Sequence, residues 1–343
     1  MKPIDVHAHY VPPSLIENVA SRASDFGLSV IEHRPTCSCA LHFDYGLKVR
    51  PFFPKLIEPM EMRLDAMSSQ GVDHQVLSAW ADIFAHGMPR QNAVAWHKYL
   101  NNHLAKVCEL RPERFSLLAS VPFPFAQESA AELERAVVKL GAVGAVIAAN
   151  VEGTNLGELD LDAFWSKAVE LDVGVFIHPV QAQPHPRSAK FALSQIAQYT
   201  VDTTFTVGSL IFSGVLDRFP QLRLLLSHGG GTLPYLAGRF DVMHQRMDRT
   251  QQGDVAIEDP SAYFQRFYYD TILHDPAILK WLADRVSPRQ IVLGSDYSFP
   301  PADQDPIATV RAAGLSEGDV TLILEDNARC LFPRLDRASR RLR

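Results

Sequence analysis

Short apolar stretches rich in β-branched residues alternate along the chain with longer stretches whose apolar residues recur about every 3.6 positions. The short stretches are "IDVHAHY" (4–10), "HQVLSAW" (74–80), "FSLLASVP" (115–122), "VGAVIAAN" (143–150), "VGVFIHP" (173–179), "LRLLLSHGG" (222–230), "RFYYDTI" (266–272) and "IVLGSDY" (291–297). The helical pattern is clear in "PMEMRLDAMSSQG", "SAAELERAVVKLG" and "LDAFWSKAVELD". Eight such alternations predict an α/β fold, a (β/α)8 TIM barrel that occupies residues 1–343 as a single domain.

The alternation is interrupted once, after the first apolar stretch. Some fifty residues separate that stretch from a helix predicted to begin near Glu61, and they include "LSVIEHRPTCSCALHFDYGLKVRPF". Alternating apolar positions and turn-like residues predict a small antiparallel insertion over residues 20–55. Because loops of this length in a compact domain are usually functional, we expect the insertion to act as a lid over the barrel mouth.

Composition narrows the class of protein. Apolar residues make up 47% and charged residues 21% of the 343 residues, as in a soluble globular protein with a large core. A net charge of −6 and the lack of a long basic run argue against nucleic acid as the main partner. No stretch is long and apolar enough for a membrane span or a signal peptide. Four cysteines suit a reducing compartment, so we expect a cytoplasmic protein.

Potential metal-binding side chains end four of the predicted strands. His7 and His9 end the first, His178 the fifth, His228 the sixth and Asp296 the eighth. Residues two apart on a strand project to the same face, so His7 and His9 point in one direction. Because the active site of such barrels lies at the carboxyl ends of the strands, we expect all five side chains to converge there.

Three imidazoles and one carboxylate suit a divalent transition metal with an open coordination position. We assign the two histidines of the first strand, His178 and Asp296 as ligands of a single ion. His228 is assigned as a general acid or base beside it, with Asp296 as a second candidate for the proton donor. The fourth stretch ends in Asn150 and contains no lysine, which argues against a modified lysine bridging two ions.

The motifs "DVHAHYVP", "HP" (178–179), "LSHGGGTLPY" and "LGSDYSFP" resemble the amidohydrolase superfamily. They are most similar to its branch that contains 2-amino-3-carboxymuconate-6-semialdehyde, γ-resorcylate, 5-carboxyvanillate and 6-methylsalicylate decarboxylases. The first motif, with two histidines, looks more like that of the semialdehyde decarboxylase than that of the γ-resorcylate enzyme. The resemblance covers the whole barrel. It implies one Zn²⁺ or Mn²⁺ ion held by the assigned ligands, with His228 as the catalytic base.

The same resemblance suggests residues that handle the substrate. Arg239 in "LAGRFD" matches an arginine that, in the family's dimers, extends into the active site of the neighbouring subunit. This match implies a homodimer. Arg50 in "LKVRPF" lies roughly where the semialdehyde decarboxylase carries a substrate-binding arginine, and the alternative is a solvated loop residue. Phe299 in "SDYSFP" matches an aromatic residue beside the site and could pack on a flat substrate or only on the barrel mouth. Trp80 either lines the pocket or plugs its rim.

Two further groups of residues are weaker candidates for a functional role. His33, Cys37, Cys39 and His42 form a compact cluster in "HRPTCSCALH", but C-x-C is not the common zinc-site spacing, and a lid hairpin is the favoured interpretation. Asp270 in "YYDT" is a candidate for orienting a neighbouring side chain.

These observations predict a metal-dependent, non-oxidative decarboxylase. Its substrate would be a small carboxylic acid, either an aromatic acid of the ortho-hydroxybenzoate type or a carboxymuconate semialdehyde. The alternative is a hydrolase or hydratase that uses metal-activated water on a ring-cleavage product or lactone. A metal-binding protein without turnover is a third interpretation, and an intact site argues against it.

Overall fold

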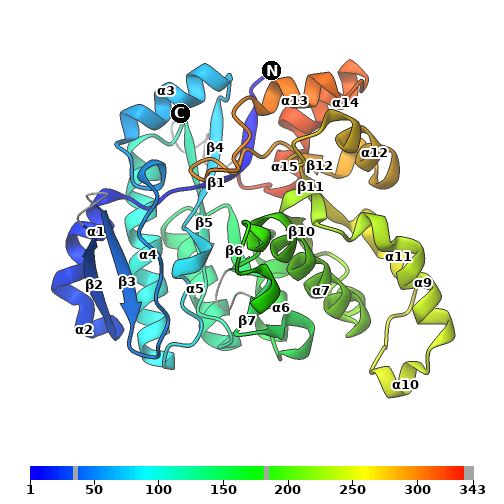
Figure 1. Ribbon diagram of the computed structural model, residues 1–343, viewed down its shortest axis with the longest axis horizontal. Helices are drawn as coiled ribbons and strands as arrows, with labels where there is room; N and C mark the ends of the chain where they lie inside the picture. The colour runs from blue at the N-terminus through cyan, green and yellow to red at the C-terminus, as the bar shows by residue number, and fades with distance from the viewer. Residues whose placement is uncertain (34–37, 181–184, 336–343) are drawn as a thin grey trace.

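The computed structural model describes residues 1–33, 38–180 and 185–335 and shows helices packed around parallel strands (Figure 1). The barrel strands are β1 (Ile4–His9), β4 (His74–Ser78), β5 (Phe115–Ser120), β6 (Gly144–Ala148), β9 (Gly174–His178), β10 (Arg223–Leu226), β11 (Phe267–Asp270) and β12 (Ile291–Val292). They follow one another around an eight-stranded sheet in that order. Each of the eight apolar stretches contains one of these strands, so the predicted (β/α)8 barrel is confirmed.

Backbone contacts between the first strand and the segment after the last strand close the barrel. The N–H of His9 donates to the carbonyl of Tyr297 at 3.2 Å, and the N–H of Asp296 donates to the carbonyl of His7 at 2.8 Å. A parallel bridge pairs Ala8 with Tyr297. Closure of the barrel therefore brings three of the predicted site residues together.

Helices connect the strands and cover the outside of the barrel (Figure 1). They are α1 (Pro13–Val19), α2 (Ala23–Phe26), α3 (Met60–Gln70), α4 (Arg90–Leu110), α5 (Ala126–Lys139), α6 (Asp162–Glu170), α7 (Tyr199–Phe212), α8 (Val215–Arg218), α9 (Ala237–Arg246), α10 (Arg249–Gln252), α11 (Pro260–Tyr263), α12 (Pro276–Val286), α13 (Pro306–Ala312), α14 (Glu317–Thr321) and α15 (Asn327–Leu331). The three periodic segments named above form α3, α5 and α6, as predicted. None of the helices in the described ranges has the length and apolar character needed to cross a bilayer.

The strands are buried on both faces. Every residue of β1, β5, β6 and β9 is buried, as expected for parallel strands between covering helices and a packed interior. Phe176, two residues before His178 on β9, packs on the His7 ring with the ring centroids 4.7 Å apart. A filled interior leaves the carboxyl ends of the strands as the place for chemistry.

Between β1 and α3 lies an antiparallel hairpin of β2 (Leu28–His33) and β3 (Ser38–Phe43), which confirms the predicted antiparallel insertion. The hairpin lies beside α4 in Figure 1. Phe26 and Phe43 pack there on the ring of Trp96, with centroids 5.1 and 5.8 Å away. The loop that follows β3 carries Arg50 to the cavity at the barrel mouth.

The second zinc site considered for this insertion falls partly outside the described residues, since these include neither Cys37 nor the side chain of His33. Cys39 is buried in the core. Cys39 and His42 are three positions apart on β3, so they project to opposite faces of the hairpin. These two residues therefore do not converge on one ion.

A buried arginine fastens α3 to the barrel mouth. The Arg63 guanidinium donates to the carbonyl of His9 (2.6 Å), to Ser298 Oγ (2.7 Å) and to Gln75 Oε1 (3.0 Å). Its Nε lies 4.0 Å from a carboxylate oxygen of Glu58. Arg63 is fully buried, so the network rather than water satisfies its charge.

We expect Arg63→Met to lower the free energy of unfolding by about 3–5 kcal/mol, because removing one member of a buried charged network leaves its partners unsatisfied. Urea unfolding of metal-saturated protein, followed by tryptophan fluorescence, measures the change. Lys280→Met is the control, because it breaks an exposed pair with Asp284 and should hardly move the midpoint. Equal shifts in the two variants would contradict a structural role for Arg63.

Candidate metal centre

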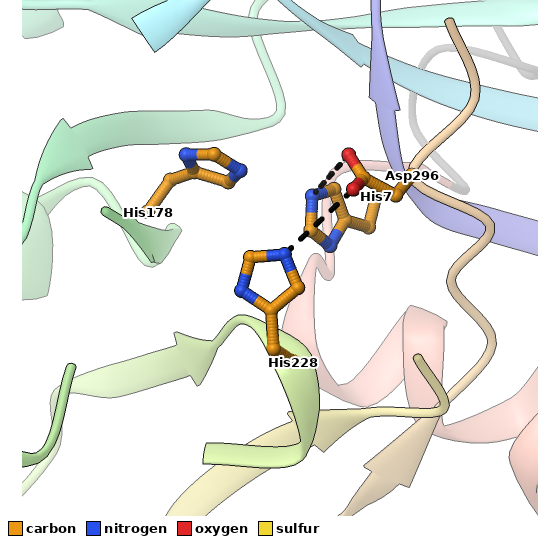
Figure 2. A group of neighbouring side chains, drawn as sticks. All are labelled: His7, His178, His228 and Asp296. Carbon is orange, nitrogen blue, oxygen red and sulfur yellow. Dashed lines mark ion pairs between the residues drawn. The ribbon is translucent and has the colours of Figure 1, made fainter. Parts of the chain in front are cut away.

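The five residues predicted from the strand ends converge at one end of the barrel. Figure 2 shows four of them, His7, His178, His228 and Asp296. His7 Nε2 lies 3.1 Å from His9 Nε2 and 3.3 Å from Asp296 Oδ1. His9 Nε2 lies 3.4 Å from the same oxygen, and His228 Nε2 lies 3.7 Å from Asp296 Oδ2. The ring of His178 lies 4.7 Å from that of His9, centroid to centroid.

Hydrogen bonds through Nδ1 orient three of these imidazoles. His7 Nδ1 pairs with Asp270 Oδ2 at 2.6 Å, and His178 Nδ1 donates to its neighbouring backbone carbonyl at 2.7 Å. His9 Nδ1 lies 3.0 Å from Ser78 Oγ. A proton held at Nδ1 leaves the lone pair on Nε2, the nitrogen that faces the cluster in each case. Such partners on the far side of the ring are typical of metal-binding histidines.

Among the four predicted ligands, two polar atoms are buried without a hydrogen bond in the described residues: Nε2 of His178 and Oδ1 of Asp296. Burial of an unsatisfied acceptor is costly. A divalent cation placed between these atoms and Nε2 of His7 and His9 would satisfy all four. The donor set of imidazole nitrogens and a carboxylate oxygen therefore fits the predicted ion.

The charges of the cluster also favour a cation. Burial lowers the pKa of His9, and together with the neighbouring imidazoles it lowers that of His178 well below its usual value. Burial opposes protonation of His7 as well, but the Asp296 and Asp270 carboxylates outweigh it and raise the pKa of His7 to about 10. Without a metal the cluster thus holds one positive charge, on His7, between two carboxylates, and a bound cation would take the place of the Nε2 proton of His7. His9 and His178 are neutral, which is the form that binds metal.

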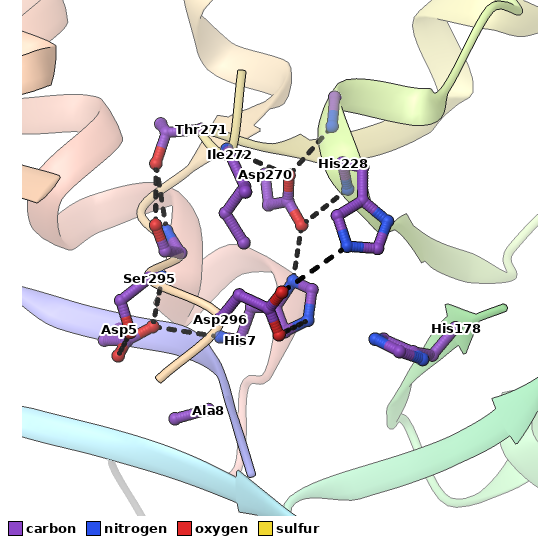
Figure 3. A network of polar contacts seen from close by, with 12 residues as sticks. Asp5, His7, Ala8, His178, His228, Asp270, Thr271, Ile272, Ser295 and Asp296 are labelled. Carbon is purple, nitrogen blue, oxygen red and sulfur yellow. Dashed lines mark hydrogen bonds and ion pairs between the residues drawn. The ribbon is translucent and has the colours of Figure 1, made fainter. Parts of the chain in front are cut away.

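Asp270, at the end of β11, contacts both the His7 ring and the turn that carries His228 (Figure 3). Its Oδ2 accepts the His7 hydrogen bond and also the backbone N–H of His228 at 2.9 Å. Its Oδ1 accepts the N–H groups of Gly229 at 2.8 Å and Ile272 at 3.1 Å. One carboxylate therefore orients a predicted ligand and positions the turn that carries the predicted base.

His228 lies closest to the open side of the cluster. Its side chain is 16% exposed, and its Nδ1 has no hydrogen-bond partner among the described residues. One ligand atom from each of His7, His178, His228 and Asp296 lies within 4.8 Å of the others, so geometry alone also allows His228 a place among the ligands.

A cavity of about 620 Å³ opens above the cluster. The candidate substrate-binding residues Arg50, Trp80 and Phe299 line it, together with His228 and Asp296. The Phe299 ring lies 5.0 Å from the His9 ring and 6.2 Å from the Trp80 ring, centroid to centroid, so aromatic surface extends from the predicted ligand His9 to Trp80.

The remaining predicted residue, Arg239, is exposed on α9 and lines a separate cavity in its own chain. Conversely, Asp82 and Tyr199 line the main cavity and were missed from the sequence. Asp82 follows the second strand closely, and a charge at that place was a usable signal. Tyr199 begins α7, and nothing in the local sequence distinguishes it.

We expect Asp270→Asn to weaken metal binding by about 10–100-fold, because the amide carries no charge to support the His7 proton that leaves Nε2 free. Competition with a chromophoric chelator measures the affinity for Zn²⁺ and Mn²⁺. Asp284→Asn, which alters an exposed aspartate paired with Lys280, is the matched control. An unchanged affinity in a folded Asp270→Asn protein would remove Asp270 from the metal centre.

Comparison with known proteins gives relatives over nearly the whole chain. A decarboxylase of 2-amino-3-carboxymuconate-6-semialdehyde from Dictyostelium discoideum is 30% identical over 87% of this chain and 82% of its own. A 2-keto-4-carboxy-3-hexenedioate hydratase from Sphingobium is 30% identical over 82% of this chain and 83% of its own.

Solved structures share the fold. The 5-carboxyvanillate decarboxylase from Sphingomonas paucimobilis superposes with a TM-score of 0.80 at 22% identity, covering 97% of this chain and 99% of its own. A dihydroxybenzoic acid decarboxylase from Polaromonas with bound manganese gives 0.73 at 21% identity, covering 97% of each chain. A family model described as amidohydrolase matches residues 4–334. With that match across the barrel and the histidine–aspartate cluster at its mouth, the chain belongs to the amidohydrolase family.

Proposed function

We propose that this protein is a metal-dependent, non-oxidative decarboxylase of a small carboxylic acid. The observation that carries the proposal is the cluster of buried imidazoles and one carboxylate at the base of an aromatic-walled cavity. The decarboxylase relative from Dictyostelium, similar over 87% of the chain, supports it. The substrate is an aromatic ortho-hydroxybenzoate or a carboxymuconate semialdehyde.

In this proposal His7, His9, His178 and Asp296 hold one Zn²⁺ or Mn²⁺ ion. Imidazole-rich sites suit zinc, whereas manganese is bound in the Polaromonas structure of similar fold. When bound, the ion acts as a Lewis acid that attracts the substrate's oxygens and its developing negative charge. These four side chains would hold such an ion at their end of the cavity, where the substrate carboxylate would bind.

The chain's own residues supply the rest of the reaction. Breaking the bond to the carboxylate leaves an electron pair on carbon, and that carbon must receive a proton as CO₂ departs. His228 faces the cavity and can hold and deliver that proton, with Asp296 as its nearest carboxylate. Phe299 and Trp80 pack on a flat substrate and exclude water from it.

A hydratase or hydrolase is the second candidate, because the Sphingobium relative is named a hydratase. The same cluster would then activate water rather than assist loss of CO₂. Measuring CO₂ separates the two reactions.

We further propose a homodimer in which Arg239 of one subunit enters the cavity of the other. Arg239 is exposed on α9 and does not line its own main cavity. The exposed apolar side chains of Tyr235, Val242 and Met243 lie nearby in the sequence and favour burial against a partner. The acidic net charge and the free cysteines of the described chain fit a cytoplasmic enzyme that binds neither nucleic acid nor membrane.

We expect metal-loaded wild-type protein to release CO₂ from one or more members of a panel of ortho-hydroxybenzoates and carboxymuconate semialdehydes. His228→Ala should lower kcat by about 10²–10⁴-fold while keeping its metal, because the proton donor is lost but not a ligand. Headspace CO₂, ultraviolet absorbance and metal content are measured together. Loss of the metal along with activity would make His228 a ligand, and an absorbance change without CO₂ would favour the hydratase.

If Arg239 acts in the cavity of the neighbouring subunit, two inactive variants should restore each other's activity in a mixed dimer. Arg239→Ala and His228→Ala proteins should each be inactive alone, yet recover about a quarter of wild-type turnover after mixing and reassociation, since half of the random dimers carry one intact site. Continued inactivity after subunit exchange, verified by mass spectrometry, would exclude a shared site.

A further inference from the structure

A second charged pair lines the cavity, apart from the metal-binding residues. Arg50 Nη2 donates to Asp82 Oδ2 at 3.0 Å, and the two side chains are 33% and 12% exposed. The Arg50 guanidinium lies 5.0 Å from the centroid of the Phe53 ring and 5.5 Å from that of Trp80. These contacts fix Arg50 from two sides and leave part of it facing the cavity.

Aromatic rings separate this pair from the metal ligands. The His9 ring contacts Phe299, Phe299 contacts Trp80, and Trp80 contacts Arg50. A flat substrate packed on these two rings, with its reacting carboxylate at the metal-binding cluster, would direct its far end toward Arg50 and Asp82.

The charges at the two ends of the cavity differ. Three residues with a carboxylate or guanidinium group line the described part of the cavity: Asp296, Arg50 and Asp82. Asp296 belongs to the metal cluster, and Arg50 and Asp82 neutralise each other. A bound divalent ion would present positive charge to the substrate at the metal end, balanced by the Asp296 and Asp270 carboxylates, whereas the far end has a donor and an acceptor but no net charge.

Tyr199 completes the far end. Burial raises the pKa of its hydroxyl above the usual range, and Asp82 adds to that rise while Arg50 opposes it. The hydroxyl therefore stays neutral and adds no charge to the pair. Its ring is stacked near that of His228, with centroids 6.5 Å apart, so it also borders the reacting end.

We infer that Asp82 determines the charge of the substrate's far end: it selects a neutral group that accepts from Arg50 and donates to Asp82, and it rejects a second carboxylate. A hydroxyl group satisfies both partners. A carboxylate could pair with Arg50 only by approaching Asp82 as a like charge or displacing it. Resting on the proposed function, this inference narrows the substrate class to hydroxylated aromatic monocarboxylic acids and disfavours carboxymuconate-type diacids.

The test is a binding comparison that does not depend on turnover. Isothermal titration calorimetry of Mn²⁺-loaded protein compares pairs of substituted salicylates. Within a pair, one ligand carries an added hydroxyl and the other an added carboxylate at the same ring carbon. One pair is made for each of the two ring carbons farthest from the salicylate's own carboxylate and hydroxyl. The quantity compared is the ratio of the two dissociation constants on one protein. A partly misfolded preparation lowers the number of sites but leaves this ratio unchanged.

We expect wild-type protein to bind the hydroxyl ligand about tenfold or more tightly than the carboxylate ligand, because the latter meets a like charge. Asp82→Asn keeps the shape but removes that charge, and it should reverse the preference. Asp82→Glu should retain it. Asp162→Asn, which alters a surface pair with Arg218, is the matched control and should behave as wild type.

Each other result overturns the inference. A wild-type preference for the carboxylate ligand, or the same ratio in wild type and Asp82→Asn, means that Asp82 does not select charge. Equal weakening of both ligands in Asp82→Asn assigns it a purely structural role, and absence of binding by every ligand also rejects the proposed subsite. The proposed decarboxylation is judged separately by CO₂ release, so it can fail while the binding preference holds.

Discussion

The pairing of the His7 imidazole with the Asp270 carboxylate is the contact on which the metal centre depends. At 2.6 Å it holds the proton of His7 on the outer nitrogen and directs the other nitrogen toward Asp296. The same carboxylate accepts backbone N–H groups from the turn at His228. Since both aspartates are buried, they create a place where positive charge is stabilised, and this is what raises the pKa of His7 to about 10.

The fold and the convergence of the strand-end residues could be predicted because each depends on a local pattern. Short apolar runs flanked by helical periodicity have few solutions other than buried parallel strands. A barrel then gathers the carboxyl ends of those strands, whatever their separation along the chain. His178 and Asp296 are 118 positions apart in the sequence and still meet, because each follows an apolar run at its strand end.

The residues that the sequence did not identify depend on contacts between distant segments. Arg63 lies on a helix, where a charged residue is usually exposed, and what buries it includes Ser298, 235 positions later. The pairing of Arg50 with Asp82 joins the loop after β3, within the insertion, to the turn after β4. Tyr199 approaches both from the start of α7. The local sequence pattern does not indicate contacts between such distant segments, so they become visible only in the folded chain.

The predicted metal ligands lie at strand ends, whereas several other cavity residues lie in loops, and this difference matters for what controls the reaction. Two relatives, each 30% identical to this chain, are named a decarboxylase and a hydratase. A shared fold therefore does not by itself determine the reaction, and the residues that orient a substrate above the metal must contribute to the choice. In this chain the cavity residues Arg50, Asp82 and Tyr199 lie in loops and at a helix start, where substitution leaves the barrel core intact. The Arg50–Asp82 pair is set there, apart from the histidine–aspartate cluster, so under the inference drawn above a substitution at this pair would alter substrate choice without changing His7 or Asp296.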